Sequence, residues 1–385
     1  MNDISSYFSP LNKGLYSVKD RWHFSQFGYQ IDSHVESYFP DLNNVDIAFF
    51  NVPEYEGTDN VSRSSDCKIR DSLYRLYFES LPKIADLGVL HIESRRKDTF
   101  KIIETVILGL MNQGILPVII GGGHDISYAV YKAYASADQT INLCCVDSSF
   151  NIGLQDDKLT ANSFFSKILS HKPSYLFNYI NLGYQTFFVK PDEVQLLNNL
   201  HFEINRLGYI QNNMHEIEPF LRNTDFLSFD MSALSSSSFM SNVYSTPNGL
   251  HGQEACQIFR YAGISDKITC IGIFEYNDAL DSHNQGAQLI AQMVWYFLEG
   301  FKSRKNELNP NLDQCVKYTV AFKDNETQID FYKSQSSGRW WMGVPLPSEN
   351  NHSDNYFVAC SYQDYERANK GEIPQRWLKT YNRFL

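Results

Sequence analysis

The sequence predicts an α/β fold, in which a mostly parallel central sheet is covered by helices on both faces in a three-layer α/β/α sandwich. Short runs that are apolar at every position alternate with longer stretches whose apolar residues recur at helical spacing. Strands that are apolar on both sides are typical of parallel sheets buried between helices. The length of 385 residues and the aromatic content of 15% suit a large core behind a broad sheet.

Each element of this alternation can be placed from its own pattern. Strands are expected at 45–51, 115–120, 141–146, 179–182, 226–229 and 268–274. Helices are expected at 69–81, 100–111, 127–135 and 285–301, where apolar side chains fall on one face. The first 44 residues mix aromatic, polar and turn residues and predict no definite element.

The last 76 residues follow a different pattern. Segments 317–322 and 327–332 alternate as strands around a turn at 324–326, which predicts a β-hairpin. We therefore expect a main α/β domain at 1–309 and a hairpin-containing extension at 310–385 packed on it.

Composition narrows the function classes. The formal net charge is −11, and no dense basic stripe offsets it, so nucleic acid is not an expected partner. The beginning of the chain lacks a signal-peptide pattern, and no apolar run is long enough for a membrane span. Seven cysteines without a C-x-x-C pair fit a reducing compartment, so we expect a cytoplasmic protein.

Chemistry-bearing residues follow four of the expected strands. His124, Asp147, Asp230 and Glu275 each stand at or just beyond a strand end. Ligands of open parallel sheets bind beyond the carboxyl ends of the strands. One histidine and three carboxylates are therefore expected to meet at one edge of the sheet.

The motifs around these residues resemble those of the ureohydrolase superfamily, which comprises arginases, agmatinases and formimidoylglutamases. Gly122-Gly123-His124-Asp125 resembles its Gly-Gly-Asp/Gly-His motif, and 147–151 lies where the family has Asp-x-His-x-Asp. Segment 228–232 lies where it has Ser-x-Asp-x-Asp, and 275–277 resembles its Glu-x-Asn. The likeness covers about residues 45–300, and the whole pattern resembles formimidoylglutamase-like proteins most.

The resemblance implies a set of ligand-binding positions. Asp147 and Glu275 would be the catalytic carboxylates, with Glu275 facing a guanidino or formimino group. Asn162 and Ser163 resemble a substrate loop, and Asn248 falls in a segment similar to the family's Gly-Gly-Leu…Glu, which makes all three expected substrate-binding residues.

The resemblance also implies a metal centre, but only half of its ligands are intact. The family's two manganese ions are bridged by two aspartates, here Asp147 and Asp230. His124 and Asn151 would complete the first site. Ser149 and Ser232 stand where the second site needs an imidazole and a carboxylate, and neutral hydroxyls are poor ligands. We expect one Mn²⁺ or another divalent cation, or no metal.

Two functions remain open from the sequence. The first is an inactive or strongly altered ureohydrolase that binds a small guanidino or formimino ligand or a protein partner. The second is a hydrolase of a C–N bond in such a compound, with a single metal. Relatives of this kind tend to assemble, so a homo-oligomer is expected in either case.

Simpler interpretations of the same residues also remain open. His124 could cap the helix that follows it, and Glu275 could pair with a buried arginine such as Arg260. A Ser–His pair with Ser148 or Ser149 is a further alternative. Without a metal, Asp147 and Asp230 would need other partners, such as the nearby serine hydroxyls.

Overall fold

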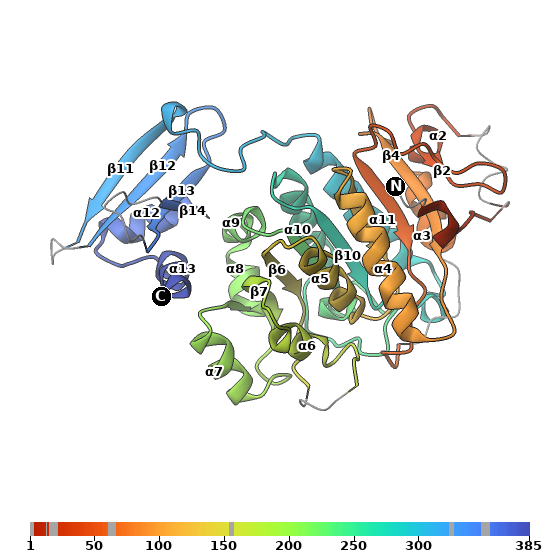
Figure 1. Cartoon of the computed structure of the whole chain (residues 1–385), viewed down its shortest axis with the longest axis horizontal. Helices are drawn as coiled ribbons and strands as arrows, with labels where there is room; N and C mark the ends of the chain where they lie inside the picture. The colour runs from red at the N-terminus through yellow and green to blue at the C-terminus, as the bar shows by residue number, and fades with distance from the viewer. Residues whose placement is uncertain are drawn as a thin grey trace.

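A central, largely parallel sheet organises the computed structural model, which describes residues 4–12, 14, 22–60, 67–153, 158–322, 327–347 and 355–385 (Figure 1). Within those residues the sheet has ten strands in the order β1-β4-β3-β5-β10-β9-β6-β7-β8, with β2 beside β4. Only β1 pairs antiparallel. The strands are β1 (Phe8–Ser9), β2 (Asp32–Ser33), β3 (Ile47–Asn51), β4 (Ile84–Leu90), β5 (Leu116–Ile120), β6 (Ile141–Val146), β7 (Leu176–Tyr184), β8 (Glu203–Arg206), β9 (Phe226–Asp230) and β10 (Cys270–Phe274).

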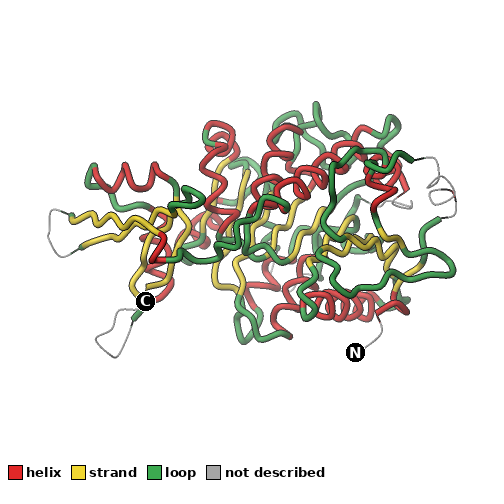
Figure 2. Tube along the Cα trace, turned by 90° about the horizontal axis from the view of Figure 1, so that it is seen from above, coloured by secondary structure: helices red, strands yellow, loops and turns green. Residues whose placement is uncertain are grey.

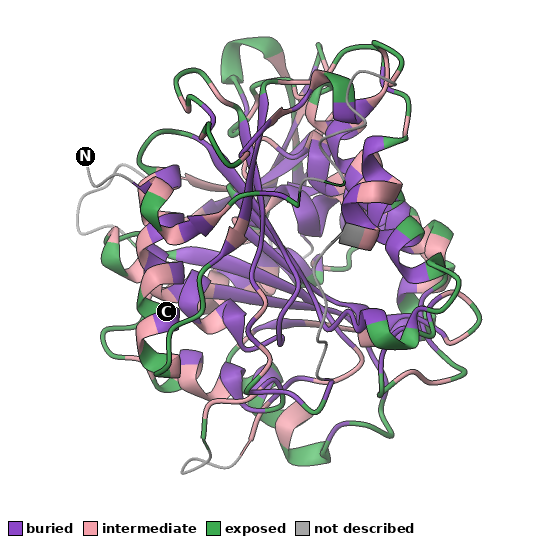
Figure 3. Cartoon of the chain, turned by 90° about the vertical axis from the view of Figure 1, so that its right-hand side faces the viewer, coloured by how far each residue is buried: buried purple, intermediate pink, exposed green. Residues whose placement is uncertain are grey.

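Both faces of the sheet are buried, as the purple strands of Figure 3 show. In β3, Phe49 belongs to the hydrophobic cluster on one face and Phe50 to the cluster on the other. The first cluster is covered mainly by α3 (Cys67–Tyr74), α8 (Leu207–Asn212), α9 (Glu218–Arg222), α10 (Gly252–Ile264) and α11 (Gln285–Phe301). The second is covered by α4 (Arg96–Met111), α5 (Ile126–Ser136), α6 (Phe164–Ser170) and α7 (Pro191–Asn199). The predicted three-layer α/β class is confirmed.

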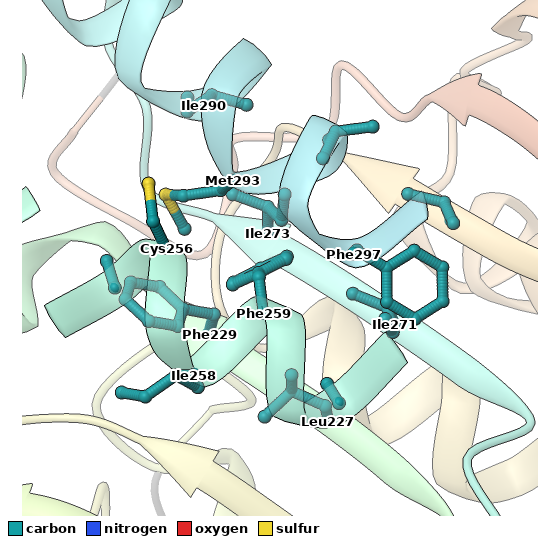
Figure 4. Close-up of a cluster of buried hydrophobic side chains, with 14 of the residues drawn as sticks. Leu227, Phe229, Cys256, Ile258, Phe259, Ile271, Ile273, Ile290, Met293 and Phe297 are labelled. Atoms are coloured by element: carbon teal, nitrogen blue, oxygen red, sulfur yellow. The ribbon is translucent and has the colours of Figure 1, made fainter. Parts of the chain in front are cut away.

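One part of the first cluster lies between β9, β10 and the helix pair α10–α11 (Figure 4). Phe229 and Phe259 meet edge to face at 5.5 Å. The two helices approach closely at Gly263 and Gly300, where a Cβ on Gly263 would lie 2.1 Å from the carbonyl oxygen of Phe297. Glycine is therefore required at this crossing.

The helix expected at 69–81 is shorter in the structure, since α3 ends at Tyr74. Leu76 and Phe78 instead exchange backbone hydrogen bonds with residues 25–27, at 2.9 and 2.7 Å. Strand β4 was not expected from the sequence, because the polar Asp86 interrupts its apolar run. The other expected strands and helices are present, with ends shifted by a few residues.

The C-terminal part forms a separate four-stranded antiparallel sheet in the order β11-β12-β13-β14. Its elements are β11 (Cys315–Ala321), β12 (Gln328–Ser334), β13 (Trp340–Pro345), β14 (Asn355–Cys360), α12 (Tyr362–Asn369) and α13 (Gln375–Phe384). The predicted hairpin is β11–β12, while its turn at 324–326 lies outside the described residues. The sheet lies beside the main body and has a hydrophobic cluster of its own (Figure 2).

Specific contacts join this extension to the main body. The buried Arg222 donates to the carbonyl oxygens of Trp340 and Cys360, both at 3.0 Å, and its guanidinium lies 4.8 Å above the ring of Trp341. Arg383 of α13 donates to Asn178 at 2.8 Å. The division at residues 309 and 310 stays a prediction. Among the described helices, none is both long and apolar enough to cross a bilayer.

Candidate metal and ligand pocket

The four residues expected to converge come from four neighbouring strands, β5, β10, β9 and β6. His124 follows β5 after three glycines, Asp147 follows β6, Asp230 ends β9, and Glu275 follows β10. Parallel pairing aligns the carboxyl ends of these strands at one edge of the sheet. The four side chains therefore meet there although they are up to 151 positions apart in the chain.

The glycine loop before His124 makes this approach feasible. Gly122 has φ of 78°, and a Cβ there would lie 2.7 Å from the carbonyl oxygen of Val52. Any larger residue would push the loop away from that segment. The run of glycines thus lets the chain turn back and place His124 over the sheet edge.

The imidazole of His124 lies between the two central carboxylates. Its Nδ1 is 3.0 Å from Oδ2 of Asp230 and 3.1 Å from Oδ2 of Asp147. The ring is fully buried between Phe164 and Phe274, with centroid distances of 4.6 and 5.6 Å. Its sides are thus fixed by packing, and its Nδ1 edge is directed at the acidic pair.

The opposite ring nitrogen of His124 is held by a serine. Nε2 lies 2.7 Å from Oγ of Ser228, which in turn lies 2.7 Å from Oγ of Ser127. Both serines are buried beneath the ring. A hydrogen bond at Nε2 orients the imidazole so that Nδ1 faces the carboxylates, which is the usual role of a partner to a metal-binding histidine.

Ser149, Asn151 and Ser232, which stand where the resemblance places metal ligands, form hydrogen bonds with the two aspartates of the cluster. Asn151 donates from Nδ2 to Oδ2 of Asp147 at 2.6 Å, and its Oδ1 accepts from the Ser149 hydroxyl at 2.9 Å. The backbone N–H of Ser149 donates to Asp147 at 2.8 Å, and its hydroxyl lies 3.3 Å away. The backbone N–H of Ser232 donates to Asp230 at 2.7 Å. Of the expected hydroxyl partners, that of Ser149 is present, whereas Ser232 bonds to Asp230 through its backbone N–H.

Glu275 occupies the floor of the pocket beside this cluster. Its two carboxylate oxygens accept from the backbone N–H of His124 at 2.8 Å and from the Thr58 hydroxyl at 2.9 Å. Its carbonyl oxygen accepts from the side chains of Asn60 and Asn242, both at 2.7 Å. Arg260 is paired with Glu299, so the interpretation of Glu275 as its partner is wrong.

Burial and mutual repulsion shift the proton affinities of the cluster. Burial and the nearby charge of Asp230 raise the pKa of Glu275 to about 8. The same two causes raise the pKa of Asp147 above its usual value. Burial alone would lower the pKa of His124, but its hydrogen bonds to Asp147 and Asp230 outweigh burial and hold it well above 6.5. The carboxylates of the cluster therefore lack enough nearby positive charge to keep their pKa values at the usual level.

A cavity of about 440 Å³ opens above these carboxylates. Its wall includes Asp147, Asp230 and Glu275, together with Ser149, Asn151 and Ser232. This volume is in the range of small-molecule sites. A larger hollow of about 790 Å³ lies between α10 and α11, but no group of carboxylates converges there among the described residues.

The expected substrate-binding residues divide between the cavity and its surroundings. Asn162 lines the cavity, as expected. Ser163 does not line the cavity. Its hydroxyl donates to the carbonyl oxygen of Lys158, in the same loop, at 2.7 Å. Asn248 also lies off the cavity, where its amide bonds to Gln185 at 3.1 Å. Both residues make hydrogen bonds within or between loops, and their expected substrate-binding role stays a prediction.

The alternatives for His124 are also decided by these contacts. The helix after it begins at Ile126, and the ring is turned to the carboxylates instead of capping that helix. Its nearest serine hydroxyl is that of Ser228, not that of Ser148 or Ser149. Because Ser228 is buried beneath the ring and does not line the cavity, it is no candidate nucleophile.

Thr58, Asn60 and Asn242 are site residues that the sequence did not indicate. They stand in loops far from the strand-end motifs, and none belongs to a pattern with a chemical meaning of its own. Their role depends on where the loops 52–60 and 239–250 run over the sheet edge. Only the folded structure shows that all three hold Glu275.

The donor set fits one metal ion and not two. The ligand atoms of His124, Asp147 and Asp230 lie within 4.8 Å of one another, and the amide of Asn151 adjoins them. One nitrogen with two carboxylates suits a divalent cation such as Mn²⁺. Asn151 turns its Nδ2 to this group and its Oδ1 to Ser149, so its amide would have to rotate to add a ligand oxygen. A second ion would have only the shared aspartates and the hydroxyls of Ser149 and Ser232, which do not make a binding set.

Comparisons with known proteins agree with this geometry. The sequence model of the Arginase family matches residues 58–299. The formimidoylglutamase of Staphylococcus haemolyticus is 24% identical over 241 residues, covering 57% of this chain and 75% of the relative. The formimidoylglutamase of Lysinibacillus sphaericus is 22% identical over 230 residues, covering 57% and 71%.

Solved structures show the same fold. Trypanosoma cruzi formiminoglutamase, crystallised with Mn²⁺, has a TM-score of 0.63 at 20% identity, covering 69% of this chain and 96% of that chain. Bacillus subtilis formimidoylglutamase has a TM-score of 0.61 at 21% identity, covering 69% and 90%. In each case about 30% of this chain lies outside the matched region.

Proposed function

Because this chain belongs to the arginase family, we propose that it keeps the family's pocket as a binding site for a small guanidino or formimino cation but has lost hydrolysis by a metal pair. The observation that carries the proposal is the contrast within one cavity wall. The wall has the carboxylates of Asp147, Asp230 and Glu275, whereas Ser149 and Ser232 stand where the resemblance places ligands of the second metal. The pocket would therefore still attract a cation, but it would not bind two metal ions.

The retained groups suit a planar cation. A guanidinium or amidinium presents several N–H donors in one plane, and carboxylates are its strongest partners. The acidic groups are buried at the cavity floor, so their attraction is weakly screened by solvent. Binding would also compensate the mutual repulsion between Glu275 and Asp230.

The consequence for catalysis follows from the same residues. In binuclear hydrolases a metal pair supplies hydroxide at neutral pH by lowering the pKa of bound water. This chain's own residues would bind the cation at Glu275 and orient it over the aspartates. Among the residues that line the cavity in the described part, no cysteine or activated serine offers a replacement nucleophile.

A hydrolase with a single metal is the second candidate, favoured by the intact grouping of His124, Asp147 and Asp230. These residues and Asn151 would hold the ion, and Glu275 would position the substrate. The two candidates share the ligand and differ in whether turnover follows binding.

One experiment separates them. The protein is purified with excess Mn²⁺, bound metal is quantified by mass spectrometry, and release of urea, ammonia or formamide is measured from arginine, agmatine and formiminoglutamate. We expect at most one ion per chain and no turnover. Two ions with robust turnover would refute the loss of hydrolysis, and one ion with turnover would favour the second candidate.

Binding is tested separately by calorimetry with methylguanidine, which is little more than the charged head group. We expect binding to the native chain and at least tenfold weaker binding to Glu275→Gln. For the metal, His124→Ala should abolish uptake, and the exposed His283→Ala should leave it unchanged. Failure of methylguanidine to bind at any concentration up to its solubility would overturn the proposal.

A further inference from the structure

The cavity changes character between its floor and its mouth. The floor carries the three carboxylates, whereas the mouth is formed in part by Phe188, Val243 and Tyr244. These three side chains are 44%, 49% and 38% exposed, which is high for large apolar residues. A ligand held at the floor by its charged end would therefore place its other end between these side chains.

The mouth is built in a fixed position relative to the floor. Asn242 and Asn60 both donate to the carbonyl oxygen of Glu275, and the backbone N–H of Val243 donates to Oδ1 of Asn60 at 3.1 Å. The backbone N–H of Tyr244 donates to Oδ1 of Asn242 at 2.6 Å. The segment that carries the apolar side chains is therefore bonded to the floor through two buried asparagines.

The other side of the mouth is also held in place. The backbone N–H of Phe188 donates to the carbonyl oxygen of Gln185 at 2.9 Å, and its ring packs edge to face on Phe187 at 4.6 Å. A preformed apolar rim loses little conformational entropy when a ligand binds. Its exposed aromatic area is consequently available for ligand contact.

His124 contacts two of the carboxylates from their buried side, but the charged side chains that line the cavity itself are all acidic in the described part of the chain. The described lining residues of the cavity include three carboxylates and no lysine, arginine or histidine. At the rim, the Tyr244 hydroxyl donates to Oδ2 of Asp59 at 2.9 Å, which adds a fourth acidic group. A ligand whose far end is a carboxylate would enter a negative field and find no cationic partner in this wall.

We propose that this pocket selects cations whose far end is neutral and apolar or aromatic, such as arylalkyl guanidines and amidines, over amino acids that carry an α-carboxylate. The inference rests on the proposed function for the charged head group and specifies the rest of the ligand. The volume of about 440 Å³ accommodates a guanidinium, a short linker and one ring.

The affinities of four probes test this selectivity: methylguanidine, phenethylguanidine, arginine and formiminoglutamate, each measured by calorimetry on the full chain. We expect phenethylguanidine to bind at least tenfold more tightly than arginine or formiminoglutamate. Arginine or formiminoglutamate binding as tightly as phenethylguanidine would overturn the inference, even where methylguanidine binds. Loss of all binding, including that of methylguanidine, would instead overturn the proposed function.

Rim variants provide the second measurement. Phe188→Ala and Tyr244→Ala should each weaken phenethylguanidine about three- to tenfold and leave methylguanidine unchanged. Phe24→Ala is the matched control, because this ring is also 68% exposed and does not line the cavity. Val243→Lys should reverse the preference toward arginine. Equal losses for both guanidines, or none for either, would show that the rim does not contact the ligand.

Discussion

At the scale of single residues, Glu275 adopts a backbone conformation that is unfavourable for its residue type. Its φ is 68°, a value that costs a non-glycine residue about 1 kcal/mol or more. The backbone N–H bonds to Gly122, the carbonyl accepts two asparagine amides, and the carboxylate accepts two further bonds. The surroundings thus hold the carboxylate over the cavity in an orientation that the chain alone would not choose.

The raised pKa of Glu275 predicts how stability depends on pH. Between its ordinary value near 4.5 and about 8, the folded state binds a proton that the unfolded state has released. The free energy of unfolding should therefore fall as pH rises through this window, by up to ~5 kcal/mol. Urea unfolding between pH 5 and 9 measures it, and Glu275→Gln should flatten the decline. An equal decline in the variant would assign the effect to other groups.

Restoring the lost ligands is the converse test at this scale. Ser149→His, Asn151→Asp and Ser232→Asp together add an imidazole and two carboxylates at the replaced positions. We expect bound Mn²⁺ to rise from at most one to two per chain, measured by mass spectrometry after dialysis. Ser148→His, one position away on the same loop, is the control. A restored chain that still binds no second ion would mean that the pocket geometry has diverged as well.

The site residues differ in how far the sequence could predict them. His124, Asp147, Asp230 and Glu275 could be placed because each follows a strand whose end lies at a known edge of the sheet. Ser163 and Asn248 do not line the cavity, because small differences in loop path decide where such side chains lie. Asn60 and Asn242 were missed, because their effect depends on contacts more than 30 positions away in the chain.

At the scale of elements, β4 is held to α3 by a buried ion pair. Arg70 and Asp86 are fully buried, with bonds of 2.7 and 2.8 Å between them, and Arg70 also donates to the carbonyl of Gly88. The Tyr74 hydroxyl bonds to the same carboxylate. An acidic residue inside a strand argues against a buried strand unless its partner is known, which is why the apolar pattern did not predict β4.

Breaking this pair should be costly. Arg70→Met leaves the carboxylate of Asp86 buried without its cation, for which we expect a loss of about 3 to 5 kcal/mol in unfolding free energy by urea titration. Arg75→Met, one residue beyond the end of the same helix, is the matched control. Its pairing with Asp71 is exposed, so a change within about 0.5 kcal/mol is expected. Similar losses for both variants would contradict the account.

At the scale of the whole molecule, the C-terminal sheet and its helices are coupled to the main body by polar groups that are buried or half-buried at the junction. Besides the Arg222 contacts, Arg376 of α13 lies 4.1 Å from the ring of Phe220, and Lys379 donates to the carbonyl of Phe202 at 2.7 Å. The sequence predicted the extension and its hairpin. It did not predict β14, α12 or α13, whose short apolar patterns are interrupted by polar side chains.

This coupling predicts a single unfolding transition. Arg222→Ala should lower the unfolding free energy by about 2 to 4 kcal/mol, because two buried carbonyl groups lose a charged donor. Urea titration followed by tryptophan fluorescence and by circular dichroism is the measurement, and the exposed Lys370→Ala is the control. Two separated transitions in the native chain would show instead that the extension folds as an independent unit.

The two asparagine amides on the carbonyl of Glu275 have a consequence for amide hydrogen exchange. Since they tie residues 58–60 and 242–246 to the pocket floor, a ligand that touches only the floor should slow exchange at the backbone amides of both segments. Methylguanidine is the suitable ligand, because it is too short to reach the mouth, so that any slower exchange there would come from contacts at the floor. Asn242→Ala should confine the protection to the floor, so that the loops would exchange as though no ligand were bound.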